Sequence, residues 1–115
     1  MSWFENLIIW QEWWKLFDEL YTIFSSQDFK HYYFKEQILW AALSITNNIA
    51  EWFESKTIKE RIQLLSYSKR SCGEVRNMIY RAKNCWMITN EQFNYFITNT
   101  KKLSIMIYKF IQQTK

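Results

Sequence analysis

Residue types that support catalysis are scarce in this chain of 115 residues, and their spacing builds no catalytic group. The single histidine, His31, lies in a tyrosine-rich segment and is typical of a surface or helix-capping residue. Glu51 and Glu54 share a helix face, but exposed carboxylates at this spacing are normally solvated, and no second pair completes a metal site. No glycine-rich loop could hold a phosphate. The sequence therefore predicts a protein that is not an enzyme.

The two cysteines, Cys72 and Cys85, form no Cys-x-x-Cys pair and have no histidine nearby. Zinc sites and redox motifs need such groupings. We therefore expect no metal and no cofactor, and we interpret both cysteines as ordinary helix residues.

Binding chemistry is concentrated in the basic residues of the second half. Residues 1–55 hold three lysines and eight acidic residues, residues 56–84 hold eight basic and two acidic residues, and residues 85–115 hold four lysines and one acidic residue. A single basic face would attract a polyanion such as nucleic acid. Alternatively, the basic third helix lies beside the acidic first helix. The candidate phosphate contacts are Arg61, Lys69, Arg70, Arg76, Arg81, Lys83, Lys101, Lys102 and Lys109.

The elements that must position these residues are predicted to be helices. One glycine and no proline leave few turn formers for a sheet, whereas 49% hydrophobic and 20% aromatic residues are enough for a packed core. Apolar residues recur at steps of three and four over four segments, about residues 3–25, 29–53, 57–84 and 89–113. We expect one all-α domain over residues 1–115, an antiparallel up-down-up-down four-helix bundle.

Capping boxes mark three of the predicted helix starts. They are the pairs Ser2 with Glu5, Thr57 with Glu60, and Thr89 with Gln92. The predicted inward rows are Phe34, Ile38, Ala41, Ile45 and Ile49 in the second segment, Leu64, Ser68, Ser71, Val75, Met78 and Ala82 in the third, and Phe93, Ile97, Thr100, Ser104, Ile107 and Ile111 in the fourth.

The first helix carries two apolar rows, more than one bundle core requires. One row is Leu7, Trp10, Trp14, Phe17, Tyr21 and Phe24, and the other is Ile9, Trp13, Leu16, Leu20 and Ile23. The excess predicts a second buried contact and hence assembly with copies of the same chain. The candidate oligomer or partner interface consists of Trp10, Trp13, Trp14, Leu39, Trp40 and Trp52.

Two polar features inside the helices need an explanation. Asn47 and Asn48 are poor helix formers in an apolar segment, so we expect them to form hydrogen bonds between helices, the alternative being that they face a partner or pore. Gly73, within the third helix, predicts close helix contact rather than a break. The longest apolar stretches are too short to cross a bilayer, so we expect a soluble, cytoplasmic protein.

From Phe4 to Phe110 the chain resembles the four helix bundle protein family, which includes 23S rRNA intervening-sequence proteins and the accessory variability determinants of diversity-generating retroelements. The motifs are weak singly but specific in order and spacing. They are Phe4, Leu7, Trp10 and Gln11, then residues 34–38 (FKEQI), 41–45 (AALSI), 47–51 (NNIAE), 59–60 (KE), 71–76 (SCGEVR) and 88–93 (ITNEQF).

The resemblance implies a homopentamer of bundles with a basic surface that engages RNA or DNA. In retroelements the similar protein also binds a reverse transcriptase. This chain has Leu39 and Trp40 where relatives usually have two arginines, and Trp52 where they usually have glycine. It has Arg61 in place of a usual aromatic residue and Arg70 in place of a small one. These differences move the expected nucleic-acid contact from the second helix to the third.

Two hypotheses remain open from the sequence. In the first, an oligomer binds structured RNA or an RNA and DNA hybrid through phosphates, as an accessory to a reverse transcriptase. In the second, the protein is a structural or protein-binding oligomer, an rRNA intervening-sequence-type protein whose charges confer only solubility.

Overall fold

The repeating three- and four-residue spacing of apolar side chains produces long helices. A computed structural model describes residues 3–26 and 29–115. A short 3-10 turn, η1 (Phe4–Asn6), precedes four helices, α1 (Ile8–Phe24), α2 (Tyr32–Glu54), α3 (Ile58–Asn84) and α4 (Asn90–Thr114). The described residues contain no strand, so the chain is all-α.

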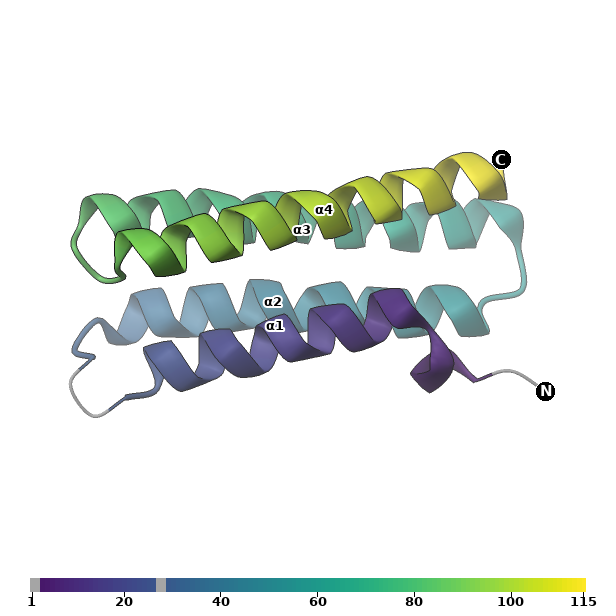
Figure 1. Ribbon diagram of the computed structural model, residues 1–115. Helices are drawn as coiled ribbons and strands as arrows, with labels where there is room; N and C mark the ends of the chain where they lie inside the picture. Colours follow the sequence, from purple (N-terminus) through teal and green to yellow (C-terminus); the bar gives the residue numbers. More distant parts are fainter. Residues whose placement is uncertain (1–2, 27–28) are drawn as a thin grey trace.

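The four helices lie side by side along the long dimension of a body of 44 × 22 × 21 Å (Figure 1). Each helix packs against its neighbours in sequence, and α1 also packs against α4. The C-terminal end of α1, the N-terminal end of α2 and the α3/α4 connection lie at one end of the body, and the α2/α3 connection lies at the other (Figure 1). Two hollows border α4, one shared with α3 and one with α1.

Two of the predicted capping residues act as helix N-caps. The Thr89 hydroxyl accepts a hydrogen bond from the Gln92 amide (3.0 Å), and the Gln92 side chain accepts one from the Thr89 amide (2.9 Å), which confirms that capping box. The Thr57 hydroxyl accepts from the Glu60 amide at 3.2 Å. Ser2, which was predicted to form a capping box with Glu5, lies outside the described residues.

The first two helices begin later than the sequence pattern predicted. Leu7 has extended backbone, which separates η1 from α1, so α1 starts at Ile8 instead of near residue 3. Phe29 lies outside α2 and packs its ring edge-on against Phe24, with ring centroids 5.0 Å apart. The α2 helix therefore begins at Tyr32 instead of near residue 29.

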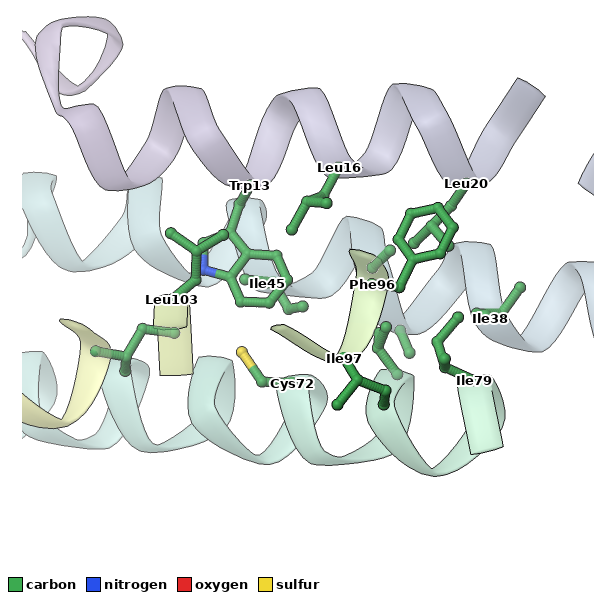
Figure 2. Packing of buried hydrophobic residues seen from close by; sticks show 14 of the residues in the cluster. Trp13, Leu16, Leu20, Ile38, Ile45, Cys72, Ile79, Phe96, Ile97 and Leu103 are labelled. Carbon is green, nitrogen blue, oxygen red and sulfur yellow. The ribbon is translucent and has the colours of Figure 1, made fainter. Parts of the chain in front are cut away.

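The core lies along the axis between the four helices (Figure 2). The complete predicted row of α4 is buried, as is the α2 row except for half-buried Phe34. In α1 the core row is Ile9, Trp13, Leu16, Leu20 and Phe24. The other α1 row is more exposed, with Trp14 45% and Tyr21 53% accessible to solvent.

The α3 helix buries a wider stripe than predicted. Leu64 and Met78 are only half-buried, while Leu65, Cys72 and Ile79 are fully buried. The predicted row missed these three residues because α3 packs between α2 and α4, so that two flanks of the helix are covered. The helix runs unbroken through its glycine. The predicted close contact at this glycine was wrong, because a Cβ atom added to Gly73 would have open space around it.

Small side chains let α2 and α3 form hydrogen bonds across their interface. The Ser68 hydroxyl donates to the Ile45 carbonyl oxygen (2.9 Å), and the Ser71 hydroxyl lies 3.1 Å from the Ser44 hydroxyl. Asn48 donates to the carbonyl (2.8 Å) and hydroxyl (3.0 Å) oxygens of Ser44 in its own helix, so it joins this interface only indirectly. Asn47 is exposed. Within the described residues, neither asparagine therefore forms the expected hydrogen bond directly to another helix.

Candidate nucleic-acid interface

A groove between α3 and α4 collects three of the predicted basic residues. Lys69 and Arg76 are seven residues apart, so they lie two turns apart on the same flank of α3. Lys101 approaches them from α4. The groove has a volume of about 410 Å³. Its lining residues are Lys69, Arg76, Lys101, Ser104, Ile105 and Tyr108.

The positive charges of this groove have no carboxylate partner. The single ion pair within residues 3–26 and 29–115 joins Lys15 to Glu12 at 3.5 Å. Both residues belong to α1 and do not line the α3/α4 groove. One terminal nitrogen of Arg76, Nη1, is buried and forms no hydrogen bond within the described chain. A buried guanidinium nitrogen without a partner is unfavourable, so an anion in the groove would stabilise it.

Aromatic and apolar side chains lie between these cations. The Lys69 ammonium lies 5.9 Å from the centroid of the Tyr108 ring, and half of the surface of Tyr108 is accessible. Ile105 is 56% exposed beside it. Sequence reasoning missed both residues, although Lys101, Ile105 and Tyr108 follow the helical spacing of one flank and could have been found from it.

The other predicted basic residues lie outside this groove. The Arg61 guanidinium stacks 5.5 Å from the Trp52 ring, and the Arg70 guanidinium lies 5.5 Å from the Tyr67 ring. Arg81 follows Arg70 by eleven residues, three helical turns, so it shares the same outer flank of α3. The nine candidates therefore do not form a single surface.

The remaining three lysines lie at different places around α4. The Lys83 ammonium lies 4.3 Å from the centroid of the Phe93 ring, at the end of α3. Lys102 lines a second groove, between α1 and α4, and Lys109 is exposed seven residues further along its flank. Adjacent lysines at 101 and 102 thus border different grooves.

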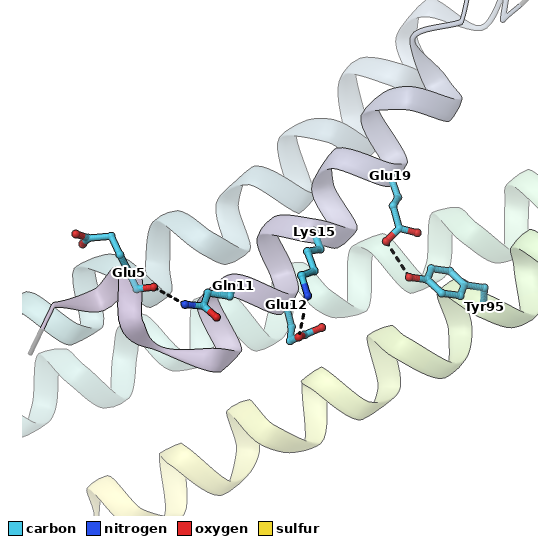
Figure 3. Close-up of polar contacts among 6 residues, drawn as sticks. All are labelled: Glu5, Gln11, Glu12, Lys15, Glu19 and Tyr95. Carbon is cyan, nitrogen blue, oxygen red and sulfur yellow. Dashed lines mark hydrogen bonds and ion pairs between the residues drawn. The ribbon is translucent and has the colours of Figure 1, made fainter.

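The charges of the groove between α1 and α4 are balanced. It has a volume of about 210 Å³, and Glu12 and Glu19 line it together with Lys15 and Lys102. The Tyr95 hydroxyl of α4 donates a hydrogen bond to Glu19 Oε1 of α1 at 2.8 Å (Figure 3). This bond raises the pKa of the Tyr95 hydroxyl, and burial adds to the effect. Glu91 lines a further hollow of the same α1/α4 side.

The side chains considered for catalysis are not assembled into a reactive centre. His31, Glu51 and Glu54 are exposed, and the Phe29 ring lies 5.4 Å from the His31 ring. Burial raises the pKa of the Cys72 thiol to about 12, and the nearby charge of Arg76 offsets this only partly. Among the described residues no group of three or more His, Cys, Asp or Glu side chains could hold a metal ion.

The predicted interface residues divide into core and surface. Trp13 and Trp52 are only 2% and 5% exposed, so they pack inside the single chain and cannot contact a partner in this conformation. Trp40 is 66% exposed. Trp10 and Leu39 are half-buried. Trp10 stacks on exposed Trp14 with ring centroids 4.9 Å apart.

Fold and groove together define a class of protein: a helical protein with a basic groove between two neighbouring helices. The chain belongs to the 23S rRNA-intervening sequence protein family, whose family model matches residues 5–109. This family is not a known enzyme class. Searches of curated proteins and of solved structures found no match. No helix in the described part of the chain combines the length and apolar character that a membrane crossing requires.

Proposed function

We propose that this protein is a non-enzymatic scaffold that binds structured RNA through phosphates in the α3/α4 groove. Its helices would form an antiparallel up-down-up-down bundle that assembles with copies of itself. The observation that carries the proposal is the convergence of Lys69, Arg76 and Lys101 from two helices on one groove without a carboxylate partner.

Phosphate binding suits the geometry and charge of this groove. Basic side chains that replace condensed counterions give binding that is strong at low salt and largely independent of sequence. The arginine can donate two parallel hydrogen bonds to one phosphate, and the lysines act as point charges beside it. The partly exposed Tyr108 ring offers an apolar face to a sugar or base at the groove edge.

The family relationship favours RNA over DNA as the polyanion. The family takes its name from the intervening sequence of 23S rRNA. RNA helices are recognised mainly by shape and through phosphate and 2′-hydroxyl contacts. A basic groove between two packed helices is compatible with that mode of binding.

A salt series with a charge-matched control tests the proposal. Filter binding of a hairpin RNA would be measured from low to high salt for the triple variant Lys69→Ala/Arg76→Ala/Lys101→Ala. We expect its dependence of log affinity on log salt to be shallower by two to three, about one for each lost contact. The control, Lys15→Ala/Lys30→Ala/Lys102→Ala, removes the same charge outside the groove. No RNA retention by the native protein at low salt would contradict the proposal.

The exposed aromatic residues of α1 and α2 support a second candidate function, assembly or protein binding. The stacked pair of Trp10 and Trp14 and the exposed ring of Trp40 leave apolar surface that one chain does not cover. We expect Trp14→Arg/Trp40→Arg to reduce the oligomer size in sedimentation while the helix content stays constant. A pentamer and a reverse transcriptase partner, which the family resemblance implies, are predictions that sedimentation and co-purification would test.

A further inference from the structure

The turn between α3 and α4 holds a tryptophan in an unusual backbone conformation. Trp86 has φ of 61°, the one positive φ at a non-glycine residue in the described parts of the chain. Its N–H donates to the Lys83 carbonyl (3.1 Å), and the Met87 N–H donates to the Ala82 carbonyl (2.8 Å). These are the two hydrogen bonds of a Schellman motif, whose left-handed residue is usually glycine.

The fold gains no packing from the indole of Trp86. The side chain is 93% exposed, the most exposed of the large hydrophobic residues described. The next residue, Met87, supplies the apolar contact that accompanies this motif, since it packs against the core. The left-handed backbone is unfavourable for folding and the exposed indole contributes nothing to it, so the tryptophan is better explained by binding than by stability.

The surroundings of Trp86 are polar and basic. The indole borders a depression of about 320 Å³, whose lining residues are Lys83, Asn84, Trp86, Ile88, Thr89 and Asn90. No carboxylate lines it, and the neighbouring Glu91 lines the opposite, α1/α4 side of α4.

The depression lies at the end of a row of basic residues on α3 that starts in the α3/α4 groove. Lys83 follows Arg76 by seven residues, as Arg76 follows Lys69, so the three cations share one flank of α3 at intervals of two turns. Seven residues of helix span about 10 Å, so this row of charges is about 20 Å long. An RNA strand that followed the row would reach the indole beyond its last lysine.

We infer that Trp86 and Lys83 bind one unpaired nucleotide adjoining the paired RNA in the α3/α4 groove, with the indole stacked on the base and the ammonium on a phosphate. The inference rests on the proposed function, and it adds a preference for RNA that has a loop or bulge. Every base has a face that can stack on an aromatic ring, so the contact tolerates different bases. Unpaired bases are the ones that proteins can reach in RNA.

The test compares two RNAs and two variants. One RNA is a hairpin with the fluorescent base 2-aminopurine in its loop, and the other is a blunt duplex with the same stem. For Trp86→Gly we expect roughly tenfold weaker binding of the hairpin, loss of the fluorescence quenching, and unchanged binding of the duplex. Because glycine suits the left-handed position, the variant should melt at the same or a higher temperature. Trp86→Phe should retain part of the quenching, and Trp3→Ala is the control for an exposed indole elsewhere.

Three results would overturn the inference in distinguishable ways. If the native protein and Trp86→Gly bind the hairpin equally and the quenching is retained, Trp86 takes no part in RNA binding. The assignment of RNA to the α3/α4 groove would be unaffected. A smaller oligomer for Trp86→Gly in sedimentation would show that the indole contacts another copy of the chain. Failure of the native protein to bind either RNA would refute the proposed function itself, and the inference with it.

Discussion

Two grooves run along opposite sides of α4, and they differ in charge. The α3/α4 groove presents Lys69, Arg76 and Lys101, whereas in the α1/α4 groove Glu12 and Glu19 balance Lys15 and Lys102. Since a polyanion is attracted by the uncompensated cations of one groove and not by the balanced charges of the other, the charge pattern selects one side of the helix. The comparison shows that the position of charges around one helix decides more than the net charge of the chain.

The largest expected effect is a difference in alkylation rate between the two cysteine thiols, Cys72 and Cys85. Cys72 precedes Arg76 by one turn, and burial raises its pKa to about 12 from an ordinary value of 9.0. Below pH 9 its thiolate fraction is therefore about a thousandfold below that of an ordinary thiol. We expect iodoacetamide to label the exposed Cys85 rapidly and Cys72 only after unfolding, as followed by mass spectrometry of the peptides. Equally fast labelling of both in the native protein would show that the core beside the groove opens.

The adjacent lysines of α4 give the sharpest test of the two grooves. Lys101→Glu places a negative charge in the basic groove, and we expect RNA affinity at 0.1 M salt to fall by roughly tenfold to a hundredfold. Lys102→Glu makes the same chemical change one residue away, in the α1/α4 groove, and should alter affinity by less than about threefold. Filter binding of both variants measures the difference. Equal losses would refute the assignment of RNA to the α3/α4 groove.

Replacing the acidic residues of the α1/α4 groove should weaken the contrast. With Glu12→Lys/Glu19→Lys, both sides of α4 become basic, and we expect RNA affinity to rise severalfold because two negative charges are replaced by positive ones. Circular dichroism would confirm that the helices persist. If the affinity of this variant falls, Glu12 and Glu19 contribute to binding, contrary to the assignment of RNA to the α3/α4 groove.

The smallest effect expected is on stability. Tyr95→Phe removes the hydrogen bond that joins α4 to Glu19 of α1. Because Tyr95 is 44% exposed, we expect the free energy of unfolding to fall by only about 0.5 kcal/mol. Urea unfolding would measure it, with Tyr80→Phe, a tyrosine of similar exposure whose ring packs on Phe93, as the control. RNA binding should not change. A loss of RNA binding in Tyr95→Phe would show that the α1/α4 groove influences binding in the α3/α4 groove.

The helices were predictable where spacing and capping agree. The α4 row and the Thr89 capping box followed directly from the sequence, because the capping residues and the helical spacing of the row agree on one orientation. The helix also buries Phe96 and Leu103, which flank the predicted row. In α1 two rows are apolar, so the pattern cannot tell that Trp13 enters the core while Trp14 remains exposed. Packing against α2 and α4 decides between them.

The candidate site was predicted only in part, for a similar reason. The sequence indicated that the second half is basic, but the direction of each side chain depends on where the neighbouring helices lie. Arg70 and Lys102 were therefore predicted as phosphate contacts together with Lys69 and Lys101, although they face other surfaces. Trp86 was overlooked because a left-handed residue is normally signalled by glycine, which this turn lacks.

Photo-cross-linking would test the central claim most directly. A hairpin RNA carrying 4-thiouridine would be irradiated with the native protein, and the cross-linked peptides would be identified by mass spectrometry. We expect cross-links to the α3 and α4 peptides that contain Lys69, Lys101 or Tyr108, and their loss in high salt. Cross-links confined to α1, or an undiminished yield in Lys101→Glu, would contradict the assignment of RNA to the α3/α4 groove.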